Sequence, residues 1–165
     1  HPCMIDKNSY ITNINGVLNA IIIEGTPIGK FTIQGEGAGA GPTTSALVSD
    51  ICSVLRGNIK FPFSITSKNR KKVQTMEISN ENTSAYIRLD VFDKTGVLSS
   101  ITKILSKNKI SVKRLIQNPF KSKKYASIII ITHESKNFNL SKSITELSRK
   151  SFVINKPKLF RIEKI

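Results

Sequence analysis

The chain has 165 residues, enough for one large domain or two small ones, and a formal net charge of +15. Its longest apolar runs, residues 20–23 and 128–131, are too short to cross a membrane, and no basic segment with a long apolar run follows the N-terminus. The spacing of a metal site or a disulfide framework is not found among the cysteines and histidines, which are Cys3, Cys52, His1 and His133. These features exclude a membrane segment and a metal site from our expectations.

The positive charge is confined to one part of the chain. Residues 1–65 hold four basic and four acidic residues, whereas residues 66–165 hold twenty-two basic and seven acidic ones. A nucleic-acid partner is one interpretation of such a balance. We prefer a solvated surface, because the lysines are dispersed along the sequence and form no single stripe.

The first sixty residues predict a hairpin followed by a helix. Residues 19–24 and 30–34 have strand composition and flank a Gly-Thr-Pro-Ile-Gly turn, and the apolar positions of residues 46–55 recur at helical spacing before Gly57. A two-stranded ribbon is marginal alone. We therefore expect this part to pack on something outside the chain.

The segment between hairpin and helix, residues 35–42 (G-E-G-A-G-A-G-P), is rich in glycine. Glycine permits close approach of the backbone to a ligand, and the N-terminus of the following helix favours an anion. Gly35, Gly37 and Ala40 fit G-x-G-x-x-A, but the next stretch, residues 59–63, carries Pro62, which argues against the central strand that a dinucleotide-binding fold needs there. A plain strand-to-helix connection is the alternative.

Residues 58–84 have the polar and basic composition of a linker, and an orderly pattern follows. Strands are predicted at 87–91, 110–117, 125–132 and 159–165, with helices starting near Val97 and Leu140. The third of these strands is apolar on both faces, as a central strand should be. The order βαββαβ indicates an α+β, ferredoxin-like fold. An RNA-recognition module shares that order, but its aromatic run is missing here.

Two stretches resemble known families. Residues 15–21 (N-G-V-L-N-A-I) and the pattern G-x-G-A-G-x-x-P-T-T-S-A-x-V-x-D of residues 35–50 resemble the end of the catalytic region of bacterial homoserine dehydrogenases. This resemblance implies an oxidoreductase that interconverts aspartate semialdehyde and homoserine with NAD(P)(H). It implies cofactor contacts at Gly37, Ala38 and Gly39. It places the dinucleotide-binding region and the catalytic residues upstream of His1, so no catalytic residue is named here.

Residues 86–98 (Y-I-R-L-D-V-F-D-K-T-G-V-L) with Ile101, Ile104 and residues 110–112 resemble an ACT domain, the amino-acid-sensing module that follows that catalytic region. Thr95 stands where proline is usual, so the turn is less preorganised. The resemblance implies an amino-acid effector, threonine first, and self-association. We expect the effector at the strand-to-helix turn, with the residues Asp93, Gly96, Val97 and Leu98. Gln117 and Asn118 would complete the polar shell if a neighbouring domain brought them alongside.

Together these features predict a cytoplasmic, oligomeric dehydrogenase fragment. Residues 1–57 are expected to be the end of its catalytic region, 58–84 a linker and 85–165 the ACT domain, in threonine and methionine biosynthesis. The chain alone should be inactive. One alternative is a stand-alone, non-enzymatic amino-acid-binding protein, and a less favoured one is a basic RNA-binding module. Neither NAD nor NADP is preferred by the sequence.

Overall fold

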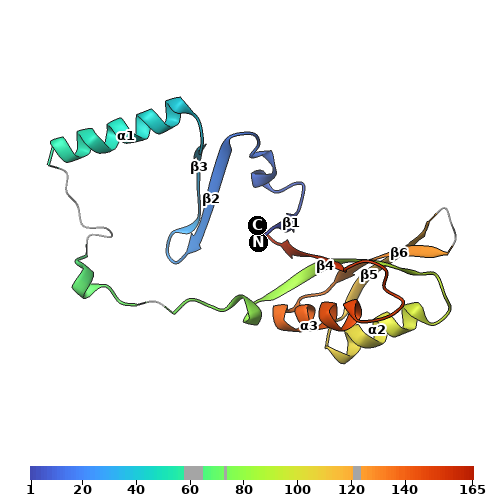
Figure 1. Cartoon of the computed structure of the whole chain (residues 1–165). Helices are drawn as coiled ribbons and strands as arrows, with labels where there is room; N and C mark the ends of the chain where they lie inside the picture. Colours follow the sequence, from blue (N-terminus) through green and yellow to red (C-terminus); the bar gives the residue numbers. More distant parts are fainter. Residues whose placement is uncertain (58–64, 73, 121–123) are drawn as a thin grey trace. The chain divides into compact units, whose positions relative to one another are not determined.

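The computed structural model describes residues 1–57, 65–72, 74–120 and 124–165, which form two compact units (Figure 1). One unit is Lys7–Gln74, and the other joins His1–Asp6 to Thr75–Ile165. The stretch with Pro62 that argued against a dinucleotide-binding turn lies outside the described residues. Among the residues described, no helix has the length and apolar character needed to span a membrane.

The Lys7–Gln74 unit contains the predicted hairpin and helix. β2 (Leu18–Gly25) and β3 (Gly29–Glu36) pair antiparallel, and α1 covers Ala40–Leu55. Short 3-10 turns lie at Tyr10–Asn13 and Ser67–Asn69. Both predicted strands are confirmed, and the structure extends each of them by one or two residues at either end.

This unit has no core of its own among its described residues, since none of them is buried. The apolar side chains of α1 are largely exposed, from 52% for Val48 to 80% for Leu55. Ile21 on β2 and Ile33 on β3 are also more than half exposed. Exposed large apolar side chains in this number mark an interaction site. The structure therefore supports the expectation that the hairpin and helix pack on other protein.

The second unit has a mixed sheet with the order β1-β8-β4-β6-β5. Its strands and helices follow the predicted order βαββαβ. Their bounds are β4 Asn82–Phe92, α2 Val97–Lys107, β5 Val112–Pro119, β6 Tyr125–Thr132, α3 Asn137–Ser148 and β8 Lys158–Glu163. Neighbours among these strands pair antiparallel. The ferredoxin-like α+β fold is confirmed, with β6 as the predicted central strand between β4 and β5.

The core of this unit lies between the sheet and its two helices, which cover one face (Figure 1). Alternation along β4 sends its odd-numbered residues into the core, and Ile87 and Leu89 are fully buried. α2 contributes Ile101 and Leu105, and α3 contributes Leu140, all at 0% exposure. Every hydrophobic residue of the buried cluster is aliphatic. Phe152 packs against this cluster from its edge, whereas Tyr86 and Phe160 lie on β4 and β8 at positions that alternate with the buried ones.

Two boundaries differ from the expected ones. β1 (Cys3–Ile5) pairs parallel with β8, so the first six residues belong by their contacts to the unit that was expected to begin at residue 85. β4 begins at Asn82, inside the predicted linker, and pairs there with the short β7 (Ser135–Lys136). A 3-10 turn at Ile78–Asn80 precedes it. Polar residues at 79–84 concealed this order, because their partners are remote in sequence.

Candidate functional site

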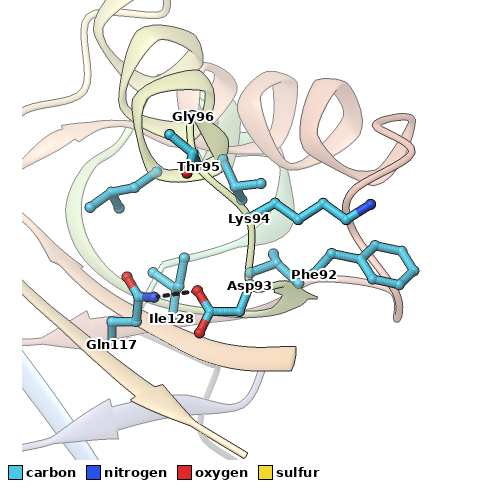
Figure 2. Close-up of a pocket in the computed structure, with 10 residues that line it drawn as sticks. Phe92, Asp93, Lys94, Thr95, Gly96, Gln117 and Ile128 are labelled. Carbon is cyan, nitrogen blue, oxygen red and sulfur yellow. Dashed lines mark hydrogen bonds between the residues drawn. The ribbon is translucent and has the colours of Figure 1, made fainter. Parts of the chain in front are cut away.

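A hollow of about 450 Å³ lies where β4 turns into α2 (Figure 2). Five of the six residues predicted for an effector site line it. The full lining is Val91, Phe92, Asp93, Lys94, Thr95, Gly96, Val97, Leu98, Gln117 and Ile128. The exposed lining of this hollow is mainly polar, which suits a small polar ligand held by a few fixed groups. The turn therefore remains the first candidate for a binding site.

The acidic side of the hollow is formed by Asp93 and Gln117. Asp93 follows β4 directly, and its N–H donates to the carbonyl of Lys124 at 2.9 Å, which fixes the start of the turn. Gln117 lies on β5, and its Nε2 donates to Asp93 Oδ1 at 3.2 Å. The two side chains point toward each other in Figure 2. Gln117 thus comes from the same unit, whereas the sequence suggested that a neighbouring domain would bring it.

Asn118 is the predicted residue that does not line the hollow. Successive strand residues point to opposite faces, so Gln117 and Asn118 cannot both reach the turn. Asn118 pairs in register with Ser127. The geometry therefore does not support a contact between Asn118 and an effector bound in the hollow of the same copy.

Gly96 carries the conformation of the turn. Its φ of +86° and ψ of −11° lie in the left-handed region, and it is the residue before the first turn of α2. A Cβ on Gly96 would meet nothing within 4 Å, so the demand for glycine is conformational rather than steric. The carbonyl of Gly96 accepts from the N–H of Ser100 at 3.0 Å and from its hydroxyl at 2.9 Å, which starts the helix.

The backbone amides at this helix start are not equivalent. Val97 donates to the carbonyl of Lys94 at 3.3 Å, so its N–H is already engaged in a turn. No backbone carbonyl accepts from Gly96 or Leu98 among the described residues. Free amides at a helix N-terminus suit a carboxylate. The Asp93 carboxylate on the other side suits an ammonium group. The hollow therefore offers one group that is complementary to the carboxylate of an amino acid and one that is complementary to its ammonium group.

The glycine-rich segment forms a second, shallower hollow of about 310 Å³. Its lining is Glu36, Gly37, Pro42, Thr43, Ala46, Leu47 and Asp50. Of the three predicted cofactor contacts, Gly37 lines it, whereas Ala38 and Gly39 do not. The predicted helix is confirmed as α1, but it begins at Ala40, so Gly41 and Pro42 lie within its first turn.

Two of these glycines have structural reasons of their own. A Cβ on Gly37 would lie 1.6 Å from Nδ2 of Asn19, and the N–H of Gly37 donates to the carbonyl of Val17 at 2.9 Å. Gly39 precedes α1 with a φ of +120°, which side chains rarely allow. Its carbonyl accepts from the Thr43 hydroxyl at 2.8 Å. The nearby Asn19 side chain therefore accounts for Gly37 and the backbone conformation accounts for Gly39, whether or not a cofactor lies against them.

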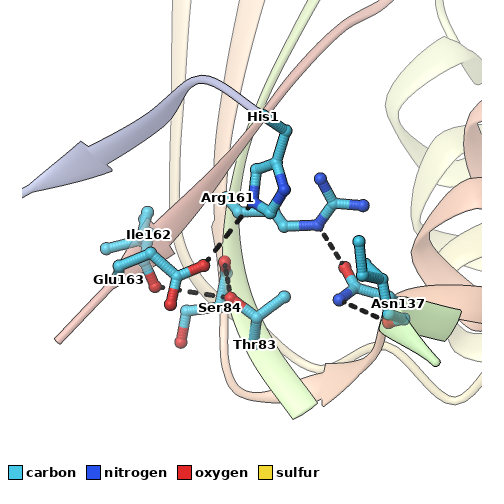
Figure 3. Close-up of polar contacts among 8 residues, drawn as sticks. His1, Thr83, Ser84, Asn137, Arg161, Ile162 and Glu163 are labelled. Carbon is cyan, nitrogen blue, oxygen red and sulfur yellow. Dashed lines mark hydrogen bonds and ion pairs between the residues drawn. The ribbon is translucent and has the colours of Figure 1, made fainter. Parts of the chain in front are cut away.

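A polar cluster at the end of β8 is structural (Figure 3). Arg161 Nε donates to Asn137 Oδ1 at 2.7 Å, and Asn137 Nδ2 donates to the carbonyl of Ile78 at 3.0 Å. His1 Nε2 lies 3.8 Å from Glu163 Oε1. The cluster fastens β1, β8 and the approach to β4 to the start of α3. In the described part of the chain, no three His, Cys, Asp or Glu side chains gather as metal ligands would.

The chain matches two family models in sequence order. A model described as homoserine dehydrogenase matches residues 1–52, and a model described as ACT domain matches residues 85–150. The second match agrees with the observed βαββαβ fold. The glycine-rich segment lies inside the first match and the strand-to-helix hollow inside the second.

Curated relatives align with almost the whole chain. A homoserine dehydrogenase of Helicobacter pylori is 31% identical over 163 residues, covering 99% of this chain and 38% of the relative. One of Neisseria gonorrhoeae is 28% identical over 171 residues, covering 100% and 39%. A crystal structure of a homoserine dehydrogenase from Thiobacillus denitrificans superposes with a TM-score of 0.83 at 29% identity, covering 99% of this chain and 38% of that one. This chain thus spans about two fifths of the length of these relatives and corresponds to their C-terminal part.

Proposed function

We infer that this chain works as the C-terminal part of a homoserine dehydrogenase, an oxidoreductase that interconverts aspartate semialdehyde and homoserine with NAD(P)(H). The observation that carries this proposal is the collinear similarity over 99% of the chain, at a TM-score of 0.83, to a solved homoserine dehydrogenase. The two family matches occur in the order that such an enzyme requires. The reaction itself needs residues beyond this chain.

The hairpin and α1 would complete the catalytic region. Their exposed apolar side chains, such as Ile21, Ile51 and Leu55, need a partner surface, and a dinucleotide-binding region in a longer protein would supply it. In that arrangement Gly37, Ala38 and Gly39 lie against the cofactor, where glycine backbone allows close approach. The general acid, the general base and the substrate carboxylates are expected outside these 165 residues.

The second unit would sense an amino acid at the β4–α2 hollow. The free amides of Gly96 and Leu98 receive the ligand carboxylate, and Asp93 receives the ammonium group. Gln117 holds the Asp93 carboxylate in place. Val91 and Ile128 form an apolar floor for a small side chain. Threonine, the effector implied by the resemblance, has a side chain of suitable size and class for such a floor.

This proposal places the protein in the cytoplasm, in threonine and methionine biosynthesis, as a homo-oligomer held together by its ACT domains. The edge strand β5 and the open sheet face are both free, among the described residues, to take part in self-association. Neither nucleic acid nor membrane is required as a partner.

The test is a kinetic one on the longer protein that contains this chain. Homoserine should reduce NAD⁺ or NADP⁺, and millimolar threonine should lower the rate, while serine of the same concentration serves as the matched control. A protein that reduces neither cofactor with homoserine would refute the catalytic part of the proposal. An active protein that ignores threonine, methionine and lysine would refute only the sensing part.

A further inference from the structure

The face of the sheet that points away from α2 and α3 has a composition of its own. In-register pairing places the even-numbered residues of β4 and their neighbours together on this open face, because paired residues share a face. Its members are Met4, Ser84, Tyr86, Arg88, Asp90, Phe92, Arg114, Ile116, Asn118, Tyr125, Ser127, Ile129, Ile131, Lys158, Phe160 and Ile162.

Nine of these sixteen residues are methionine, isoleucine, phenylalanine or tyrosine, and Lys158 is the single lysine among the sixteen. Met4, Ile116 and Phe160 are each about two fifths exposed, and the rings of Tyr86 and Phe160 lie 6.4 Å apart. Aromatic residues, methionine and arginine are enriched, and lysine depleted, in protein–protein interfaces. The composition is therefore that of an interface rather than of a solvated face.

The helical face of the same unit is the opposite. Two hollows there share Lys107 and are lined by further lysines; these are Lys103, Lys109, Lys136, Lys142 and Lys150. Among the described lysines, only Lys158 is a member of the open face, and Lys94 reaches its margin, with Nζ 5.5 Å from the centre of the Phe92 ring. The open face is therefore poorer in lysine than the helical face. The contrast between the two faces argues against a uniform compositional bias as the explanation.

The middle of the open face holds one opposite-charge pair. Arg88 Nε lies 3.4 Å from Asp90 Oδ1, and the side chains are 41% and 19% exposed. Both of these atoms are buried and make no hydrogen bond in the structure. Asp90 Oδ2 accepts only a long hydrogen bond, 3.4 Å, from Asn155 Nδ2. The pair is thus incompletely satisfied, although it lies on β4, which has neighbours on both sides in the sheet.

We propose that the open face packs against the same face of a second copy, with Arg88 of each copy opposite Asp90 of the other. The proposal deepens the oligomerisation proposed above and names its surface. The two copies would be related by a two-fold axis that lies between the two sheets and crosses β4 at right angles, level with Leu89. Rotation about this axis brings Arg88 of one copy opposite Asp90 of the other. Interfaces of this kind are self-complementary. Two sheets packed face to face also bring their inner side chains together.

A second copy fits this face better than a nucleic acid does. Asp90 lies at its centre and would repel phosphates, and the central pair is neutral as a unit. The other two cations of the face, Arg114 and Lys158, lie outside this pair. The reciprocal arrangement instead gives each arginine a second carboxylate and each aspartate a second cation. Charge complementarity across the two-fold axis therefore favours a second copy of the chain over a nucleic acid as the partner of this face.

The experiment uses charge reversal in two differently tagged forms of the 165-residue chain. The variant Arg88→Asp has two aspartates at the centre of the open face in each copy, and the variant Asp90→Arg has two arginines there in each copy. Each variant should associate with itself about tenfold more weakly than the original chain, since like charges meet across the axis. An equimolar mixture of the two variants should recover association in co-purification, because every aspartate then faces an arginine.

Two further variants keep the outcome interpretable. The double variant Arg88→Asp with Asp90→Arg should self-associate like the original chain, and Lys103→Asp on the helical face should change nothing. Equal association of like and mixed pairs would overturn this face as the interface while leaving oligomerisation through another surface intact. A chain that stays monomeric throughout, or that binds a labelled oligonucleotide through Arg88 instead, would overturn the proposal itself.

Discussion

At the scale of single residues, the hollow at the β4–α2 turn joins residues that are close in sequence to one that is remote. Asp93 and Gly96 are adjacent in sequence to the strand end and the helix start, so local turn chemistry points to both. Gln117 is a different case. Its contact with Asp93 depends on the pairing of β5 with β6, and sequence could suggest the residue but not which copy supplies it.

We expect Asp93→Ala to weaken threonine binding to the longer protein by about tenfold or more, because a charge-assisted hydrogen bond to the ammonium group is lost. Isothermal titration calorimetry measures the change. Glu146→Gln on α3, which also removes a carboxylate but lies in the other hollow, is the control and should leave affinity unchanged. Full affinity after Asp93→Ala would place the effector elsewhere.

The glycine-rich segment allows a structural role to be separated from a cofactor role. Gly37→Ala should lower the melting temperature of the longer protein, since the new Cβ would collide with the Asn19 side chain. Adding Asn19→Ala should restore most of the stability. If the double variant also regains its original KM for the cofactor, Gly37 serves packing alone; a KM that stays raised at restored stability supports contact with the cofactor.

The same argument applies to Gly39 with a different cause. Its φ of +120° makes alanine strained even though Pro42 Cδ would lie no closer than 3.4 Å from the new Cβ. Gly39→Ala should therefore cost about 1 kcal/mol or more of stability. A raised cofactor KM or a lowered kcat would show an additional role, whereas unchanged kinetics with a lowered melting temperature would favour the purely structural one.

At the scale of elements, strands with strong alternation or continuous apolar runs could be predicted, and short paired segments could not. β4 alternates and β6 carries the continuous isoleucine run of residues 128–131, so both could be predicted from sequence. β1 has three residues and pairs with β8 at the far end of the chain. No local sequence pattern predicts a pairing between segments so far apart in the chain. The same holds for β7 and for the turn at Ile78–Asn80, whose order depends on Asn137.

Asn137 is the residue that connects these elements. It is 2% exposed. Its Oδ1 accepts a hydrogen bond from Arg161 Nε, and its Nδ2 donates one to the carbonyl of Ile78. Asn137→Ala should destabilise the fold by about 1–3 kcal/mol, because buried polar partners are left unsatisfied. Thermal unfolding followed by circular dichroism measures this. Asn139→Ala, two residues along the same helix, should cost clearly less, and equal losses would argue against the polar cluster.

At the scale of the whole molecule, the two units differ in what they can do alone. Thr75–Ile165 with His1–Asp6 contains the buried aliphatic core, while the described residues of Lys7–Gln74 have none. Sequence reasoning anticipated this difference, since a hairpin and a helix cannot bury their own apolar faces. It could not find the boundary at residue 6, because that depends on which sheet the N-terminal strand joins.

The most direct test of the account compares the 165-residue chain with the longer protein that contains it in one assay, homoserine-dependent reduction of NAD⁺ or NADP⁺. The chain aligns with only 38% of a solved homoserine dehydrogenase, so the account predicts turnover by the longer protein and none by the chain at equal molarity. Turnover by the isolated chain, or its absence from the longer protein with both cofactors, would contradict it.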